Sequence, residues 1–143
     1  KRVPPPARGL DFGCGPGPAL AAMLREAGFD MAVFDPFYAP DASVLVPGFD
    51  FITATEVVEH LREPGAELRR LRALLRPGGW LGIMTKLVLD RERFATWHYI
   101  RDPTHIGFFS RETLQWWAER EGWALTFADK DVILLRRVGC SCR

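Results

Sequence analysis

The chain has 143 residues, of which 48% are hydrophobic and 26% charged, and its formal net charge is +1. This length suits one domain and this composition is globular, which excludes the disordered and collagen-like classes. The near-neutral charge does not favour binding to nucleic acid or to an anionic membrane. No apolar run approaches the roughly 20 residues of a membrane span. The N-terminus lacks the apolar stretch of a secretory signal.

The three cysteines, Cys14, Cys140 and Cys142, are odd in number and contain no Cys-x-x-Cys pair. This pattern argues against a disulfide framework and fits a reducing, cytoplasmic location. His98, His105 and the last two cysteines have no recognised metal-ligand spacing, so we expect no metal site. We expect residues 1–143 to form one domain that lacks an N-terminal cap segment, because the chain reaches its glycine-rich turn almost at once.

The first third of the chain predicts one strand–helix–strand unit. A short strand over 8–12 runs into glycines at 13–17, and Pro18 suits the first turn of a helix. That helix ends at Gly28, and an apolar strand over 31–34 closes on Asp35.

The rest of the chain continues the alternation of strands and helices. Residues 36–47 are irregular, with at most a short strand over 43–46. The further predicted elements are a strand over 49–54, a helix over 64–76, a strand over 80–88, a long loop over 89–109, a helix that begins after Ser110 and ends at Gly122, and a hairpin of strands over 123–128 and 132–137. This order predicts an α/β fold: a Rossmann-like, mostly parallel sheet with helices on both faces and a C-terminal antiparallel hairpin strand.

The most informative spacing is Asp11-x-Gly13-x-Gly15-x-Gly17. Glycines at alternate positions let the backbone turn sharply and approach a ligand, and the N–H groups that begin the next helix attract an anion. Asp35 ends the second strand about 20 residues later, where a carboxylate can bind both hydroxyls of a ribose. The pattern therefore predicts a site for adenosine that carries a charged tail.

Two ligand classes fit that description. In the dinucleotide fingerprint G-x-G-x-x-G, the last glycine would stand where this chain has Pro18. The chain also places Asp11 beside the turn, where a carboxylate would repel a pyrophosphate and attract an amino group. Both features count against NAD(P) and a nicotinamide-dependent oxidoreductase, which remains the weaker alternative. The structural alternative to both ligands is that the glycine-rich segment is a plain strand-to-helix connection without a binding role.

Residues 10–17, LDFGCGPG, resemble motif I of the class I S-adenosylmethionine-dependent methyltransferases. Residues 49–61, FDFITATEVVEHL, resemble the family's fourth strand and the E-x-x-E-H turn after it, and residues 74–79, LLRPGG, resemble the stretch before its fifth strand. The three segments occur in the family's order and cover most of the first ninety residues.

The resemblance implies S-adenosylmethionine as cofactor. Asp11 would lie near the methionine amino group, Gly13, Gly15 and Gly17 would line the methionine tail, and Asp35 would hold the ribose. The cofactor-binding residues carried over are Asp11, Gly13, Cys14, Gly15, Gly17, Asp35, Pro36, Ala54, Thr55 and Glu56. The chain departs from the family in two ways: the third strand and its helix are reduced to about a dozen residues, where Phe37 and Tyr38 could stack on the adenine, and the N-terminal helices are absent.

The loop before residue 110 is the candidate for the methyl acceptor, because long loops in small domains are usually functional. His105 is the first candidate for a general base or acceptor-orienting group and His60 the second, since imidazole titrates near neutral pH. Both histidines also have structural alternatives: fixing the loop and packing beneath the site. Trp97, Tyr99 and Phe108 are candidate substrate contacts or core residues.

Three functions remain open: a methyltransferase acting on oxygen or nitrogen of a small or medium-sized molecule, a non-catalytic S-adenosylmethionine-binding or scaffold domain, and the oxidoreductase. DNA amino-methyltransferases carry a D/N-P-P-Y/F tetrad after the fourth strand, where this chain has residues 54–57, ATEV. We therefore expect no nucleic-acid partner and no membrane partner. The sequence does not indicate an oligomeric state.

Overall fold

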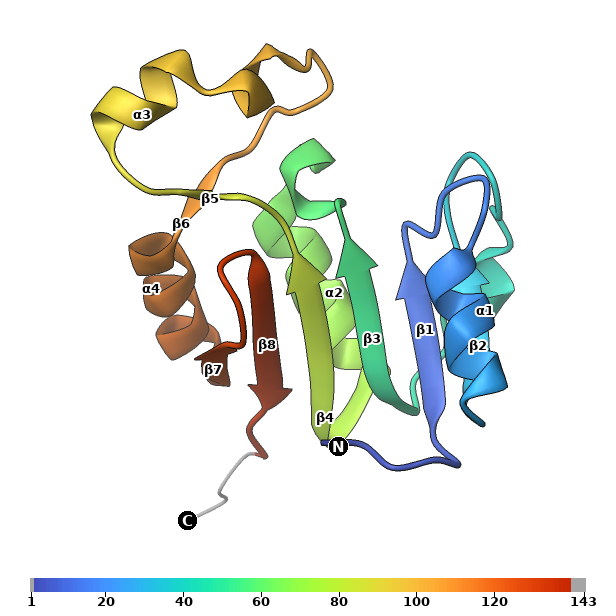
Figure 1. The fold of residues 1–143 in the computed structure, drawn as a ribbon. Helices are drawn as coiled ribbons and strands as arrows, with labels where there is room; N and C mark the ends of the chain where they lie inside the picture. Colours follow the sequence, from blue (N-terminus) through green and yellow to red (C-terminus); the bar gives the residue numbers. More distant parts are fainter. Residues whose placement is uncertain (1, 140–143) are drawn as a thin grey trace.

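The computed structural model describes residues 2–139, so Cys140 and Cys142 lie outside the described part. Six strands form one sheet, drawn in Figure 1. Their spatial order is β2 (Asp30–Phe34), β1 (Arg8–Phe12), β3 (Phe49–Thr55), β4 (Leu75–Met84), β8 (Val132–Arg137) and β7 (Trp123–Phe127). The first four are parallel neighbours, while β8 pairs antiparallel with both β4 and β7. The expected mostly parallel sheet with a C-terminal antiparallel strand is confirmed.

Helices cover both faces of this sheet (Figure 1). Helix α1 (Ala19–Glu26) lies over β1 and β2 on one face, where Ala21 packs with Met31 and Phe51. Helices α2 (Pro64–Leu74) and α4 (Arg111–Glu121) lie on the other face and form the larger core with alternate residues of the strands, such as Leu10 and Ile52. The side-chain period of two along each strand sends successive residues to opposite faces, which is why the strands have nearly continuous apolar runs.

The connection between β2 and β3 is reduced, as the sequence indicated. The sequence allowed at most a short strand over 43–46, and the structure has none: it has a single 3₁₀ turn there, Ala42–Val44 (η1), whose N-terminus is capped by Asp41 through the Ser43 backbone N–H. A side-chain cap of this kind satisfies a free N–H locally and favours a turn over a strand. The residues 2–7 that precede β1 contain no helix.

Other boundaries also differ from the sequence prediction. Strand β4 begins at Leu75, and its register with β3 shifts at the segment that contains Pro77, Gly78 and Gly79, so this segment is a bulge within a strand and not a gap before one. At its other end β4 stops at Met84, and the short strand β5 (Leu87–Val88) pairs with β6 (Phe109–Ser110).

The long loop is more regular than expected. It contains helix α3 (Arg91–Thr96), which Asp90 caps through the Arg93 backbone N–H, and the 3₁₀ turn His98–Arg101 (η3). Figure 1 shows this segment standing above the carboxyl ends of β3 and β4. It therefore lies over one part of the carboxyl edge, while the ends of β1 and β2 are not beneath it. No helix among residues 2–139 is both long and apolar enough to cross a membrane.

Candidate active site

The glycine-rich turn follows β1 at the carboxyl edge of the sheet. Gly13 has a φ of +74°, and a Cβ at this position would lie 2.4 Å from a methyl carbon of Val57. Only glycine combines this backbone conformation with such a close approach. The Gly13 N–H donates to the carbonyl of Phe34 at the end of β2 (2.7 Å), so the turn is tied to the neighbouring strand.

Asp35 is the acceptor for three backbone N–H groups. Gly15 donates to one carboxylate oxygen (3.0 Å), and Phe37 and Tyr38 donate to the other (2.9 and 3.1 Å). Burial acts to raise the pKa of Asp35, but these three donors together hold it below the ordinary value of 3.8. The carboxylate is therefore ionised at neutral pH and joins the glycine-rich turn to the end of β2.

Asp11 lies beneath the same turn with only 4% of its surface exposed. The Thr53 hydroxyl donates to it across the β1–β3 pair (2.8 Å). Burial raises the pKa of Asp11 above its ordinary value, although the Thr53 hydroxyl, the Ala21 backbone and Arg25 oppose that rise. Asp11 in β1 and Asp35 after the neighbouring strand β2 thus have pKa values shifted in opposite directions.

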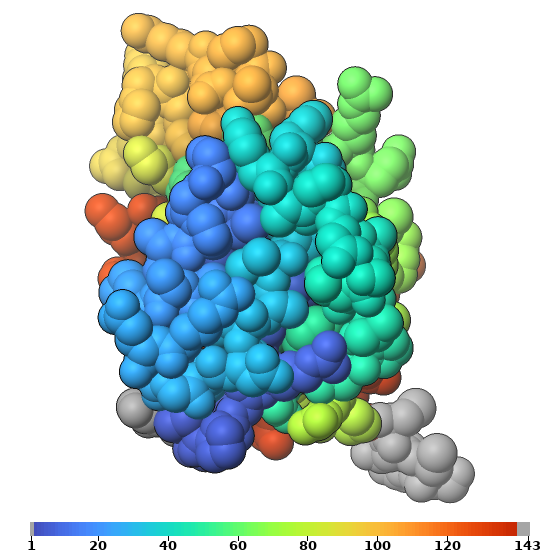
Figure 2. Space-filling view, turned by 90° about the vertical axis from the view of Figure 1, so that its right-hand side faces the viewer, coloured from blue at the N-terminus to red at the C-terminus, as the bar shows by residue number. Residues whose placement is uncertain are grey.

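A cavity of about 350 Å³ opens at the other edge of the sheet, and a larger cavity, about 710 Å³, lies at the carboxyl edge. Its lining combines the glycine-rich turn and the segment after β2 with the turn after β3 and helix α2. The lining residues include Phe12, Gly13, Phe34, Asp35, Pro36, Phe37, Tyr38, Glu56, Val57, His60, Leu61 and Thr104. Figure 2 shows the segments after β2 and around residues 95–107 projecting at this end of the molecule. The volume is that of a small-molecule site.

The cavity brings together only part of the predicted cofactor set. Gly13, Asp35, Pro36 and Glu56 line it, while Asp11, Cys14, Gly15, Gly17, Ala54 and Thr55 do not. Ala54 is fully buried in the core and has no surface exposed to a ligand. Gly15 takes part through its bond to Asp35.

Glu56 has an unusual backbone. Its φ of +52° makes it the one non-glycine residue with positive φ among the described residues, and its N–H donates to the Met84 carbonyl (2.8 Å). This conformation costs about 1–3 kcal/mol in a non-glycine residue and is concentrated at functional sites. It places the Glu56 side chain at the cavity wall. Burial and the nearby Glu59 carboxylate raise the pKa of Glu56, against the effects of Tyr99 and Lys86.

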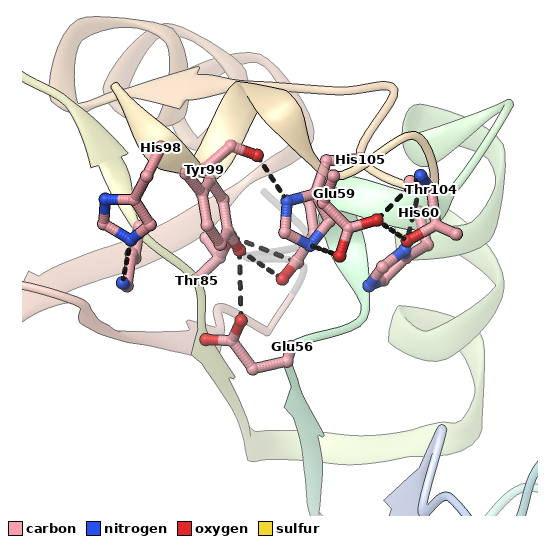
Figure 3. Close-up of polar contacts among 10 residues, drawn as sticks. Glu56, Glu59, His60, Thr85, His98, Tyr99, Thr104 and His105 are labelled. Atoms are coloured by element: carbon pink, nitrogen blue, oxygen red, sulfur yellow. Dashed lines mark hydrogen bonds and ion pairs between the residues drawn. The ribbon is translucent and has the colours of Figure 1, made fainter. Parts of the chain in front are cut away.

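Tyr99 is the centre of a polar cluster behind this wall (Figure 3). Its hydroxyl oxygen lies 3.1 Å from a Glu56 oxygen and within hydrogen-bond distance of Glu59, and its single proton can be donated to either carboxylate; it also lies 3.4 Å from the Thr85 hydroxyl. Thr85 in turn donates to the second Glu59 oxygen (3.1 Å). Glu59 and Thr85 are almost completely buried. Burial and the hydrogen bond to Glu59 raise the pKa of Tyr99 well above its ordinary value, so the hydroxyl keeps its proton.

The two candidate histidines are neighbours. Their rings lie 4.8 Å apart, and His60 lines the cavity while His105 lies behind it, 4.0 Å from the Tyr99 ring. Nδ1 of His60 is 2.9 Å from the Thr104 carbonyl, and Nδ1 of His105 is 2.7 Å from the Tyr99 carbonyl. His105 therefore fixes the loop, which was the structural alternative for it, and remains within reach of the site only through His60 and Tyr99.

The candidate substrate aromatics form one cluster. Trp97 packs on Tyr99 (4.9 Å between ring centroids), and Phe108 contacts Phe94, Trp97 and Tyr99. Tyr99 is only 5% exposed. These rings form the packing of the segment over the sheet, and Trp97 also lines a second cavity of about 290 Å³ next to Lys86.

Glu59 and Thr85 are site residues that the sequence analysis did not assign. Glu59 is the second glutamate of the E-x-x-E-H segment. Its position between the apolar Val58 and the candidate His60 is the sequence feature that could have identified it. No local pattern identifies Thr85, because its role depends on the end of β4 and on a glutamate 26 positions away.

Three comparisons with known proteins bear on this site. A family model described as "Methyltransferase domain" matches residues 1–126. No curated protein matches the chain by sequence.

Many solved structures share the fold. The structure named LaPhzM has a TM-score of 0.69 at 17% identity, covering 95% of this chain and 51% of that one. A putative methyltransferase of Haloferax volcanii, solved with the Trm112 activator, has a TM-score of 0.71 at 13% identity. The match covers 96% of this chain and 85% of that one. The Burkholderia thailandensis 1,6-didemethyltoxoflavin-N1-methyltransferase, solved with S-adenosylhomocysteine, has a TM-score of 0.64 at 19% identity, covering 94% and 72%. The chain spans about half of the length of LaPhzM, and between half and two thirds of the length of three further methyltransferase structures that share the fold. At these identities the likeness establishes the Rossmann-like fold.

Proposed function

Because this chain belongs to the methyltransferase-domain family, we propose that it transfers the methyl group of S-adenosylmethionine to an oxygen or nitrogen atom of a small or medium-sized acceptor and releases S-adenosylhomocysteine. One observation carries the proposal. The Asp35 carboxylate is ionised, is bonded to the Gly15 N–H, and lies on the wall of the 710 Å³ cavity. This arrangement suits a ribose beside a glycine-rich turn.

The rest of the cofactor follows from that anchor. The adenine would lie among Phe34, Phe37 and Tyr38, which line the cavity next to Asp35. Phe37 is 86% and Tyr38 61% exposed, so both rings are accessible for stacking on a base. We assign the methionine end to the turn from Gly13 to Gly17, with Asp11 beneath it as the counter-charge for the amino group.

The sulfonium end would then face Glu56 and His60. Methyl transfer is an in-line displacement, and the cofactor supplies the reactive group, so the protein mainly positions the acceptor and receives its proton. Glu56 and His60 are the titratable side chains that line this part of the cavity, and we propose that they orient the acceptor. His105, the first candidate in the sequence, would act on the loop and not on the acceptor directly, because it does not line the cavity and its Nδ1 is bonded to the Tyr99 carbonyl.

Calorimetric titration with S-adenosylhomocysteine, S-adenosylmethionine and NADH tests the cofactor. We expect micromolar binding of both adenosyl-sulfur compounds and none of NADH. Binding of NADH alone would refute the proposal and favour the oxidoreductase. The non-catalytic alternative predicts cofactor binding without turnover, so the release of S-adenosylhomocysteine should be followed with a panel of phenolic, carboxylic and amino acceptors.

A further inference from the structure

A cluster of one carboxylate and two imidazoles lies at the wall of the cavity. Glu59 and His60 belong to the 3₁₀ turn Val58–His60 (η2), and His105 belongs to the segment before β6. One potential ligand atom from each of the three residues lies within 4.8 Å of the other two. We propose that Glu59, His60 and His105 form a binding site for a divalent transition-metal ion, which goes beyond the methyl-transfer activity proposed above.

The orientation of both imidazoles favours this site. In each ring Nδ1 faces a backbone carbonyl, that of Thr104 for His60 and that of Tyr99 for His105. A carbonyl only accepts, so Nδ1 carries the proton and the lone pair of the neutral ring is on Nε2. Metal-binding histidines almost always have this arrangement, in which one ring N–H is bonded to a carbonyl or carboxylate and the other nitrogen is left for the metal.

The carboxylate is held in the same way. Glu59 is completely buried, and its two oxygens accept from the hydroxyls of Tyr99 and Thr85. Each carboxylate oxygen has two lone pairs, so one remains on each oxygen after these bonds. All three candidate ligands are thus positioned by hydrogen bonds that leave their metal-binding lone pairs free.

Within the described part of the chain, the Glu59 carboxylate is not paired with a protein cation, although Lys86 lies 5.4 Å from the Tyr99 ring centroid and acts on the Glu56 carboxylate. No Lys or Arg among residues 2–139 forms an ion pair with Glu59, and the Glu56 carboxylate shares the same Tyr99 hydroxyl. Buried carboxylates need a paired cation or a metal, since hydroxyl donors carry no net charge. Asp102 adds a third carboxylate nearby, 3.8 Å from Nε2 of His105, which is too long for a hydrogen bond. A divalent cation would offset this concentration of negative charge.

The ligand set indicates the class of ion. Two imidazoles with one carboxylate suit zinc and its first-row neighbours better than magnesium or calcium, which prefer oxygen ligands. Ligand atoms about 2.1 Å from a tetrahedral ion lie about 3.4 Å apart, so the cluster must contract by about 1–1.5 Å. His60 is exposed, and its side chain can supply this movement. His60 also lines the cavity, so an ion bound by this residue would lie next to the cavity.

The experiment measures metal binding directly, without any methyl-transfer assay. The protein, with Cys140→Ser and Cys142→Ser to remove the thiol pair at the end of the chain, is stripped with a chelator and titrated with Zn²⁺ and Mn²⁺ by calorimetry. Co²⁺ absorption serves as a second readout, because its visible bands report the coordination geometry and the absence of thiolate. We expect one Zn²⁺ per chain, bound more tightly than Mn²⁺.

His60→Ala, His105→Ala and Glu59→Gln should each weaken Zn²⁺ binding at least tenfold. His98→Ala is the matched control, since this histidine is bonded to Lys86 outside the cluster and its loss should leave Zn²⁺ binding unchanged. Circular dichroism and thermal melting confirm that each variant is folded, and His60→Ala, at an exposed position, decides the question if the buried variants do not fold. No Zn²⁺ binding by the parent protein, or equal affinity in the parent and His60→Ala, overturns the proposal. The cluster would then balance its charge with protons.

Discussion

The glycine-rich turn with Asp35 and the cluster around Tyr99 lie at the same edge of the sheet but are built differently. Asp35 is held by backbone N–H groups of its own turn and of the turn after the adjacent strand. The Tyr99 cluster is held by side chains from separate segments: Glu56 and Glu59 after β3, Thr85 after β4, and Tyr99 in η3. The first region depends mainly on backbone conformation, and the second depends on buried side-chain partners.

This difference separates two roles. Backbone donors do not move independently of the sheet, so in the proposed function the Asp35 region presents a preorganised surface to the adenosine. Side-chain partners can be exchanged without altering the strands, so under the same proposal the Tyr99 region is where the chemistry of the acceptor can vary on one fold. Substitutions that act on backbone conformation in one region and on hydrogen bonding in the other can test the contrast.

Gly13→Ala should have the largest effect. The new Cβ would lie 2.4 Å from Val57, and alanine would have to adopt a φ of +74°. Strain and overpacking together should cost about 3–4 kcal/mol in the free energy of unfolding, measured by urea denaturation. Gly17→Ala is the control, because no atom lies within 4 Å of its Cβ, and it should change stability by less than about 0.5 kcal/mol. Equal losses in the two variants would contradict the backbone argument.

Glu59→Ala should follow, at about 3 kcal/mol measured in the presence of a chelator. It removes the buried carboxylate that the Tyr99 and Thr85 hydroxyls contact, leaves Glu56 as the carboxylate partner of Tyr99, and opens a cavity. Glu59→Gln keeps the size and one acceptor oxygen and should recover at least half of the loss. If Glu59→Ala is as stable as the parent, the Tyr99 cluster is not a structural unit.

Asp35→Ala should weaken S-adenosylhomocysteine about 30-fold or more, close to 2 kcal/mol, because it removes a charged acceptor from both the ribose and the Gly15 N–H. His105→Ala should change the affinity less than about threefold, since this ring does not line the cavity. Calorimetric titration of the two variants provides the test. Similar losses in both would place His105 in the cofactor site.

The smallest effects should appear in the pH dependence of stability. Asp35 has a lowered pKa, so the stability it contributes is present above about pH 4 and is lost as the pH falls through its folded-state pKa. Asp11 has a raised pKa, so its contribution is full below about pH 4 and is lost as the pH rises through its folded-state pKa. The differences between the parent and Asp35→Asn, and between the parent and Asp11→Asn, should therefore change with pH in opposite directions. Thermal melting between pH 3 and 7 measures both, and parallel profiles would contradict the assignment.

Much of the fold could be predicted from particular residues. Apolar runs over 8–12, 31–34 and 49–54 identified three parallel strands, and the α4 N-cap Ser110 and the C-terminal Gly122 were both placed correctly. The structure differs from the prediction where a side chain or a neighbouring strand competes with local propensity. The Asp41 cap turns residues 42–44 into a 3₁₀ turn, and the register shift in β4 keeps the Pro77–Gly79 segment within the strand.

The sequence by itself determined the glycine-rich turn, the carboxylates at Asp11 and Asp35, and the alternation of strands and helices that makes the sheet mostly parallel, because these depend on backbone conformation and on periods of two and 3.6 residues. Only the tertiary structure decided that Glu59, His60 and His105 meet behind Glu56 and that Tyr99 joins the two glutamates. Those contacts cross up to 46 positions of sequence, and no local pattern specifies which buried hydroxyl or imidazole will face a buried carboxylate.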